Sequence, residues 1–421
     1  MSLLLWADEG IDINEEDLFG ESELIAEVGE EELASSLEDT LLTNEGVEIG
    51  GEYTFTVNPS WRWNRANIDY DESLDIKLET SLFFDARPDE DFRVFGKAKG
   101  AYPFTEDRVS VTELFSDFNL NDRVFFRGGK HLISLGVGYF FSPADIINPT
   151  PINPRDPEAE REGPISLKTN IPLGVHNFYL YEIVDDIDEL AELSLAPRVE
   201  LVLGNLEIGV GAFLKHEGPQ AGMITLTTSS GDFDIFGEAS LSFGAAKRFV
   251  RETDISPEHP LGLEVIDRDD DIFLSGTLGF KYSNQDDLGY FKITLIGQYM
   301  YYGYGYEDPD ILKNNSQGVA FFLSRNELCL ADLAFPGRHY VASSINWDSL
   351  FDSDFSIKLF WRGNLSDGSG QVIPTLSLKR SDELEFSLGV PVTYGEEGNE
   401  FTPSGSMLSV SFEVSFGSGS F

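Results

Sequence analysis

The sequence has no long hydrophobic run. Its 421 residues are 41 % hydrophobic, yet no stretch approaches the roughly 20 consecutive apolar residues that a membrane-spanning helix needs. The mean hydropathy of -0.17 resembles that of a soluble protein. A transmembrane barrel would have a similar value, because half of each of its strands faces water. The composition therefore argues against a helical membrane protein and leaves a membrane barrel open.

Cysteine is nearly absent, and basic residues are few. The single Cys329 excludes an internal disulfide and a Cys-based zinc site, and cysteine avoidance is typical of exported proteins. The 29 Lys and Arg face 74 Asp and Glu, which gives a net charge of -45. This balance argues against a nucleic-acid partner, because phosphate binding needs clustered Lys and Arg. It favours either solubility and adaptation to salt or a surface that concentrates cations.

Motifs for catalysis and metal binding are also missing. The five His are dispersed without zinc-binding spacing, and the sequence has no Gly-x-Ser-x-Gly elbow and no phosphate-cradling loop. The local candidate for hydrolysis is His339 with Ser343, which we interpret as an ordinary strand-end histidine. The acidic cluster at 267–271 could hold Ca²⁺ but is better interpreted as a solvated loop. We predict neither an enzyme nor a cofactor.

Alternation of apolar and polar residues dominates the chain after Gly46. It is clear at 74–84, and the hairpin signal Gly204-Asn205 separates two further alternating segments. The segments are near the length of a tilted transmembrane strand, and their number predicts about 16 strands, between about 14 and 18. We therefore predict an all-β fold, a transmembrane antiparallel up-and-down β-barrel wide enough for an aqueous lumen. The pattern is weak at 171–183, 222–243 and 319–330.

A soluble β-sandwich or propeller would also alternate. Two features favour the membrane barrel. Many strands carry their charged residues on one face, and aromatic residues gather near strand ends, as in the girdles at membrane interfaces.

The last strand has one apolar face and one small polar face. The apolar face consists of Leu408, Val410, Phe412, Val414 and Phe416. This strand resembles the C-terminal signal strand of bacterial outer-membrane barrels, which closes on an aromatic residue. The resemblance implies recognition by the barrel-assembly machinery. The usual signal has its aromatic residue at the last position, whereas Phe421 here falls on the other face and Phe416 is in phase.

The most distinctive segment starts with the glycines at 128–138 and continues through Ser142-Pro143-Ala144-Asp145 and Asn148-Pro149 to Arg161-Glu162-Gly163. Over about Gly129 to Gly163 it resembles porin-like outer-membrane proteins. In these, a Gly-rich strand leads into a loop with Ser-Pro-x-Asp, Asn-Pro, Asp-Pro and Arg-x-Gly. The preceding strand is the fifth by our count. The resemblance implies that the long loop at 140–170 folds into the lumen and narrows it.

The same resemblance implies a charged constriction. The loop would supply Asp145, Asp156, Glu158, Glu160, Arg161 and Glu162, and the neighbouring strands would supply the basic wall of Arg93, Lys97, Lys99 and Arg127. Carboxylates opposite a basic wall make a transverse field that sorts solutes by charge. The alternative is a rigid surface loop, with wall charges that only hydrate the lumen.

The N-terminal segments differ from the rest. Residues 1–7 resemble the end of a secretory signal peptide without its basic region, and we interpret them as a remnant of one. Residues 8–45 contain no Lys or Arg, and their apolar residues have near-helical spacing. We predict an acidic, partly helical periplasmic arm that is either a solvated extension or a plug of the barrel mouth, followed by the barrel at 46–421.

The predicted function is passive diffusion of small hydrophilic solutes or ions through a bacterial outer-membrane porin, with a cation preference suggested by the net charge. The expected partners are outer-membrane lipid, the assembly machinery and, in one of two oligomeric alternatives, two further copies in a homotrimer. A surface-displayed adhesin or structural barrel with a closed lumen is the main alternative. A barrel lipid hydrolase that uses Ser343 and His339 is the third.

Overall fold

The computed structural model describes residues 47–64, 70–89, 91–103, 109–184, 193–216, 218–285, 292–350, 353–381 and 384–420. The predicted signal-peptide remnant at 1–7, the acidic arm at 8–45 and Phe421 lie outside these residues. Among the described residues, no helix has the length and apolar character needed to cross a membrane.

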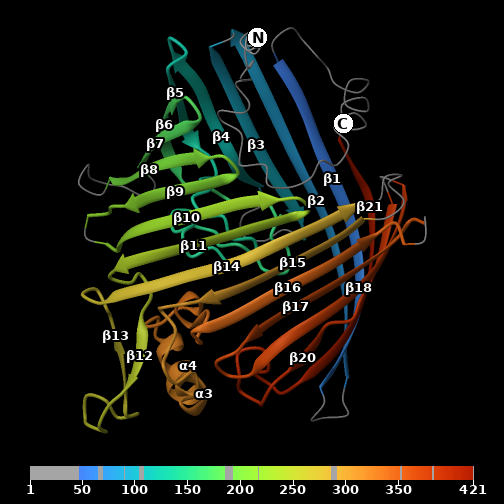
Figure 1. Cartoon of the computed structure of the whole chain (residues 1–421). Coiled ribbons are helices and arrows are strands. Elements are labelled where there is room, and N and C mark those ends of the chain that lie inside the picture. Colours follow the sequence, from blue (N-terminus) through green and yellow to red (C-terminus); the bar gives the residue numbers. More distant parts are fainter. Residues whose placement is uncertain are drawn as a thin grey trace, which may run out of the picture. The chain divides into compact units, whose positions relative to one another are not determined.

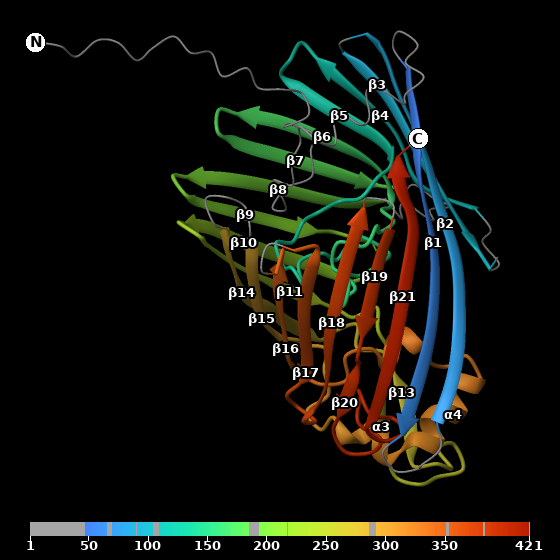
Figure 2. The same cartoon turned by 90° about the vertical axis from the view of Figure 1, so that its right-hand side faces the viewer.

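Strands make up most of the described chain (Figures 1 and 2). They are β1 (Val47–Asn64), β2 (Tyr70–Asp89), β3 (Phe92–Tyr102), β4 (Val109–Leu120), β5 (Val124–Lys130), β6 (Ile165–Leu173), β7 (His176–Ile183), β8 (Ser194–Leu203), β9 (Leu206–Phe213), β10 (Gln220–Ser230), β11 (Phe233–Phe243), β12 (Phe249–Glu252), β13 (Leu263–Ile266), β14 (Ile272–Gln285), β15 (Lys292–Tyr301), β16 (His339–Asp348), β17 (Phe355–Asn364), β18 (Ser369–Ser381), β19 (Leu384–Gly389), β20 (Val392–Tyr394) and β21 (Met407–Ser420). The helices are α3 (Asp310–Asn314), α4 (Ser316–Ser324) and the 3₁₀ helix η2 (Leu330–Leu333).

The strands form a closed antiparallel barrel. Each strand pairs with the next along the chain, β11 pairs with β14 across the separate hairpin β12–β13, and β1 pairs with β21 to close the ring. Both β19 and β20 lie between β18 and β21, so they are one strand interrupted at Val390 and Pro391. The described barrel therefore has 18 strands. This number is the upper end of the predicted range, and the predicted fold class is confirmed.

The weakly patterned segments divide into two kinds. Residues 171–183 and 222–243 fall in β6, β7, β10 and β11 and are strands. Residues 319–330 lie mainly in α4 and the turn after it. There the apolar residues pack within a loop module at one barrel end, so the two-residue period is lost.

The outer wall is apolar and the inner wall is mostly polar. In β14, Ile272 and Leu278 are 69 % and 64 % exposed, whereas Phe273 and Ser275 between them are 3 % and 1 % exposed. A soluble sheet buries its apolar face, so an outward apolar face indicates a surrounding of lipid. The apolar residues of the alternating pattern thus face the lipid side of the wall, and the residues between them face the lumen.

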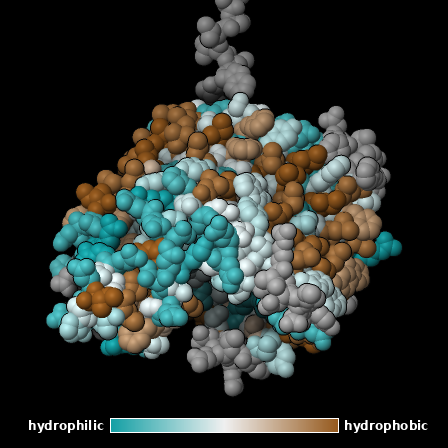
Figure 3. Space-filling model, turned by 90° about the horizontal axis from the view of Figure 1, so that it is seen from below, coloured by the Kyte–Doolittle hydropathy of each residue, from teal (hydrophilic) through white to brown (hydrophobic). Residues whose placement is uncertain are grey.

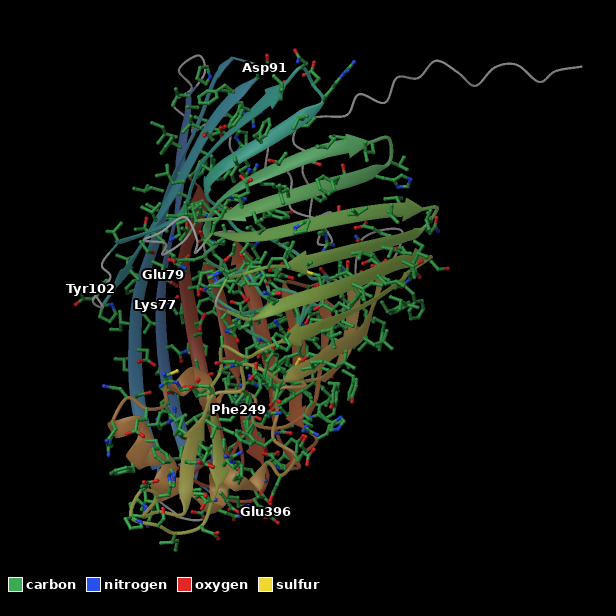
Figure 4. All side chains as sticks on the ribbon, turned by 90° about the vertical axis from the view of Figure 1, so that its left-hand side faces the viewer. Lys77, Glu79, Asp91, Tyr102, Phe249 and Glu396 are labelled. Carbon is green, nitrogen blue, oxygen red and sulfur yellow. The ribbon has the colours of Figure 1, made fainter. Side chains whose placement is uncertain are left out.

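The two ends of the barrel differ. Tight turns join strands at one end, such as Gly174 and Gly204, both with positive φ. At the other end are the longer segments 244–271, 302–338 and 395–406, and Figure 4 shows Asp91 of a tight turn and Glu396 of a long loop at opposite ends. In bacterial barrels the short turns are periplasmic and the long loops are extracellular.

A small apolar module stands at the long-loop end. Val250 and Leu263 of the hairpin β12–β13 pack against Val319 and Phe322 of α4 and against Leu328. Seen from this end, hydrophilic residues spread across the middle of the molecule and hydrophobic ones lie toward its edges (Figure 3).

The last strand has the predicted orientation. Leu408 and Phe412 are exposed on the outer wall, and Phe416 lies in register with Phe55 of β1. Because β21 pairs with both β1 and β19, the terminal strand is the one that closes the barrel.

Candidate pore constriction

A long loop crosses the interior of the barrel. Strand β5 ends at Lys130 and β6 begins at Ile165, and the segment 131–164 between them runs inside the ring of strands in both ribbon views (Figures 1 and 2). We name it the lumen loop. It follows the fifth strand, where the sequence predicts it, but its bounds differ from the predicted 140–170. Residues 165–170 belong to β6, and the glycine-rich residues 131–138 have left the sheet.

A buried carboxylate on β11 holds the first half of the lumen loop. One oxygen of Glu238 accepts hydrogen bonds from the backbone N–H of Val137 at 2.6 Å and of Gly138 at 3.0 Å. The other oxygen accepts the N–H of Ala144 at 3.0 Å. Bonds between N–H groups and a carboxylate are among the stronger hydrogen bonds in proteins. Glu238 thus fixes two stretches of the loop at one point of the wall.

A buried amide on β15 holds the next residues. Gln298 accepts the N–H of Phe140 at 2.6 Å and of Phe141 at 3.3 Å through its oxygen. Its nitrogen donates to the Phe141 carbonyl at 2.6 Å and to Thr277 Oγ1 at 2.7 Å. All these partners are consistent with one amide orientation, in which the oxygen accepts and the nitrogen donates. Gln298 therefore links the barrel wall to the loop by hydrogen bonds.

Arg198 on β8 provides the third anchor. Its guanidinium donates to the Leu135 carbonyl of the loop, to Thr225 Oγ1 at 3.1 Å and to Glu200 at 2.9 Å. Arg198 is only 4 % exposed, so its charge needs these partners. We call Arg198, Glu238 and Gln298 the wall clamp. They come from three strands and bind the loop at several points between residues 135 and 144.

Two glycines make this close approach feasible. A Cβ at position 136 would lie 1.8 Å from Ser142 Oγ and 2.7 Å from a Glu238 oxygen. A Cβ at Gly138 would lie 1.9 Å from the Phe141 carbonyl oxygen. These two glycines of the lumen loop therefore allow its backbone to reach the wall clamp, a close approach of the kind for which glycine is used.

Apolar packing supports the polar anchors. Phe140 and Phe141 are buried against Ile296, Tyr340 and Phe360 of the wall formed by β15, β16 and β17. On the other side, the loop residues Ile133, Leu135 and Ala144 pack on Tyr181, Ala196 and Met223. Burial of one such large side chain contributes about 1.5–3 kcal/mol. The lumen loop is therefore packed on the wall from β7 to β17.

The predicted acidic residues of the loop are mostly paired. Asp145 binds Arg161 within the loop and accepts an amide hydrogen bond from Asn148. Glu160 and Glu162 lie 3.4 Å from Lys97 and 3.0 Å from Lys130. The other two acidic residues, Asp156 and Glu158, lie where the loop backbone turns. Glu158 accepts the Tyr139 hydroxyl at 3.0 Å, and the N–H of Asp156 bonds to the Asn153 carbonyl at 3.0 Å.

The predicted basic residues share the inner face of β3 and β5, and each faces a carboxylate. Arg93 makes two bonds of 2.9 Å to Asp85. Arg127 binds Asp117 at 2.7 Å and lies over the Phe115 ring, 4.1 Å from its centre. These wall carboxylates were not expected from the sequence, because their partners lie on neighbouring strands.

Lys99 follows the same rule. Its amino group is 3.4 Å from Glu79 of β2, which also binds Lys77 at 2.9 Å, as labelled in Figure 4. The sequence predicts loop carboxylates opposite a basic wall. In the structure, Arg93, Lys99 and Arg127 pair with acids of the wall, and Lys97 pairs with Glu160 of the loop. Paired charges produce a weaker transverse field than separated rows would.

The other candidates from the sequence are not assembled into sites. His339 and Ser343 are four residues apart on β16, which corresponds to about 13 Å at about 3.3 Å per residue. The His339 Nδ1 atom is 2.7 Å from the Tyr299 hydroxyl. In the acidic cluster, Asp271 pairs with Arg268, and within the described ranges no group of three or more acidic, His or Cys side chains could hold a metal ion.

Comparison with known proteins agrees with this architecture. The sequence matches no known family profile and no curated protein. Among solved structures, OccAB1 of Acinetobacter baumannii superposes with a TM-score of 0.50 at 8 % identity, over 87 % of this chain and 96 % of that one. Weaker likenesses are OccK1 (OpdK) of Pseudomonas aeruginosa (TM-score 0.48, 9 % identity, 89 % and 99 % covered) and OmpF of Salmonella typhi (0.47, 10 %, 90 % and 100 %).

The fold is that of a porin-like outer-membrane β-barrel. Together with the apolar outer wall, it places the chain in a bacterial outer membrane.

Proposed function

We propose that this protein is an outer-membrane channel for the passive diffusion of small hydrophilic solutes, with the lumen loop as its constriction. The observation that carries the proposal is the loop itself. Its residues 133–144 are bound to the inner wall by the wall clamp and by buried apolar contacts, so a narrowing of fixed geometry stands inside an 18-stranded barrel. A barrel of this width leaves an aqueous path unless it is plugged. Such a channel needs no cofactor and carries out no reaction.

A cation preference is the finer part of the proposal. The charges near the lumen loop are largely paired, so we attribute the preference to the excess of 74 acidic over 29 basic residues on the whole chain. An acidic surface raises the local concentration of cations near the pore mouths. The preference would then be moderate. Barrel assembly through β21, and association into a monomer or a homotrimer, also belong to the proposal.

Single-channel recording of the refolded protein in planar bilayers tests the channel. Stepwise openings with ohmic current are expected, from the full chain or from a chain without residues 1–45 if the acidic arm is a plug. If both chains are silent although gel migration shows a folded, heat-modifiable barrel, the channel proposal fails. The surface-display alternative, which requires a closed lumen, would then take its place.

A further inference from the structure

The outer wall has a groove near its long-loop end. The groove has a volume of about 280 Å³ and is lined by Trp63, Val392, Thr393, Ser406, Met407 and Leu408. Trp63, Val392 and Leu408 are 37 %, 36 % and 42 % exposed on the outside of the barrel. The groove thus lies where β20 and β21 meet the end of β1, at the seam that closes the ring.

The groove exists because the sheet is incomplete at this place. Strand β20 has three residues, and one pair, Val392 with Leu408, joins it to β21. At the next position the N–H of Met407 donates to the side-chain hydroxyl of Thr393 at 2.9 Å instead of to a backbone carbonyl. Pro391, before β20, has no N–H to give to the ladder. The Pro391 carbonyl still accepts the N–H of Ser409 at 2.8 Å, but the ladder is incomplete on both sides of the Val392–Leu408 pair, and the groove lies over this place.

Its surroundings identify what fills the groove. The groove interrupts the apolar outer wall, which faces hydrocarbon in a membrane. Beside it, Trp361 donates to the Tyr394 hydroxyl at 2.8 Å. Such amphipathic aromatic residues mark the boundary between headgroups and acyl chains. The volume is just below the 300–1,000 Å³ typical of pockets for whole small molecules, so it suits a segment of chain.

We propose that this groove binds one acyl chain of an outer-leaflet lipid. The chain would cover Trp63 and Leu408 and fill the groove over the incomplete ladder. The polar groups there, the Thr393 hydroxyl and the Met407 backbone, already bond to each other, so the groove requires no polar ligand. The proposal is independent of whether the barrel conducts.

Native mass spectrometry tests this site. The protein is reconstituted in vesicles of one phosphatidylethanolamine of known mass, extracted into detergent and weighed with the lipid it retains. Val392→Trp fills the groove, and Leu376→Trp, at a 41 % exposed position elsewhere on the outer wall, is the matched control. We expect the native and Leu376→Trp proteins to retain one lipid more than Val392→Trp. Equal retention by all three, or none by the native protein, overturns the proposal.

A second measurement leaves Val392 and Leu408 of the groove in place. Trp61 and Trp63 lie on the outer face of β1, and both are 37 % exposed, but only Trp63 lines the groove. Two variants are made, one that keeps only Trp61 and one that keeps only Trp63, with Phe at every other Trp position. Lipids with brominated acyl chains quench the fluorescence of a tryptophan that they contact. We expect Trp63 to stay quenched longer than Trp61 after dilution into vesicles without bromine. The same rate for both tryptophans would contradict a bound chain.

Discussion

At the scale of single residues, the constriction depends on side chains far apart in the sequence. Glu238 and Gln298 lie about 100 and 160 positions after the loop residues that they bind. An inward acid or amide on a strand also has a simpler interpretation, hydration of the lumen. The sequence therefore indicates the loop and its glycines but cannot show which wall residues hold it. The sequence near Glu238 offers one local sign of its role: this acid follows Gly237 on a strand whose alternation is weak.

Replacement of Glu238 by Gln should loosen the lumen loop. The amide keeps one acceptor oxygen but turns an NH₂ group toward backbone N–H groups. A hydrogen bond to a charged group contributes about 1.5–3 kcal/mol, so we expect a loss of about 2 kcal/mol in the free energy of unfolding. Denaturant titration measures this, and single-channel records should show more open-state noise. Asp234→Asn, on the inner face of the same strand, is the control and should leave both readings unchanged.

Gly136→Ala tests the close approach at the loop. The new methyl group would overlap Ser142 Oγ and a Glu238 oxygen, so the loop must shift from the wall. Overpacking of this kind costs about 1–3 kcal/mol. Gly222→Ala on β10 is the matched control, because a Cβ there meets nothing within 4 Å. Similar stabilities for the two variants would show that the loop does not need glycine at this position.

At the scale of elements, alternation predicts strands and faces well because both follow from a period of two. The residues at which a strand ends are harder to predict from the sequence. The residues at 131–138 resemble a continuation of β5, but their backbone bonds go to Glu238, Asn148 and Pro164 instead of to a neighbouring strand. Charge pairing is equally hidden, because Asp85 and Asp117 meet Arg93 and Arg127 only through the register of β2 to β5.

The ion pair between the lumen loop and β3 should affect selectivity more than stability. Lys97 and Glu160 are each 27 % exposed in their side chains, and pairs of this kind contribute about 0–1 kcal/mol. Lys97→Gln leaves the Glu160 carboxylate unpaired and should shift the reversal potential in a salt gradient toward cations. Glu160→Gln should shift it toward anions. Shifts of the same sign would show that neither charge faces the ion path.

The loop at 395–406 should respond to pH. Burial raises the pKa of Glu400 to about 7, against hydrogen bonds from Tyr340 and Asn364. Because the pKa of Glu400 is raised in the folded state, Glu400 contributes fully to the stability of the folded protein below about pH 4.5. This contribution is lost as the pH rises through about 7. The melting temperature should fall more between pH 5 and 8 in the native protein than in Glu400→Gln. Glu396→Gln, at an 84 % exposed side chain, should behave like the native protein.

At the scale of the whole molecule, the acidic excess acts over longer distances than any single pair. Salt screens such effects, because the Debye length falls from about 10 Å at 0.1 M to about 3 Å at 1 M. The proposed cation preference should therefore decrease markedly when the mean salt concentration rises tenfold. Reversal potentials at one fixed gradient ratio measure it. A preference that does not change with salt would place the selecting charges inside the constriction.

The distances along the chain between the lumen loop and its anchors also set an order in time. The loop can be bound fully only after β8, β11 and β15 have joined the growing wall, more than a hundred residues later for the last of these. Until then Phe140 and Phe141 have no wall to pack on, and contacts of such long sequence separation form slowly. A partly built barrel would hold an open, wet interior, and its narrowing would be one of the last features that the maturing protein acquires.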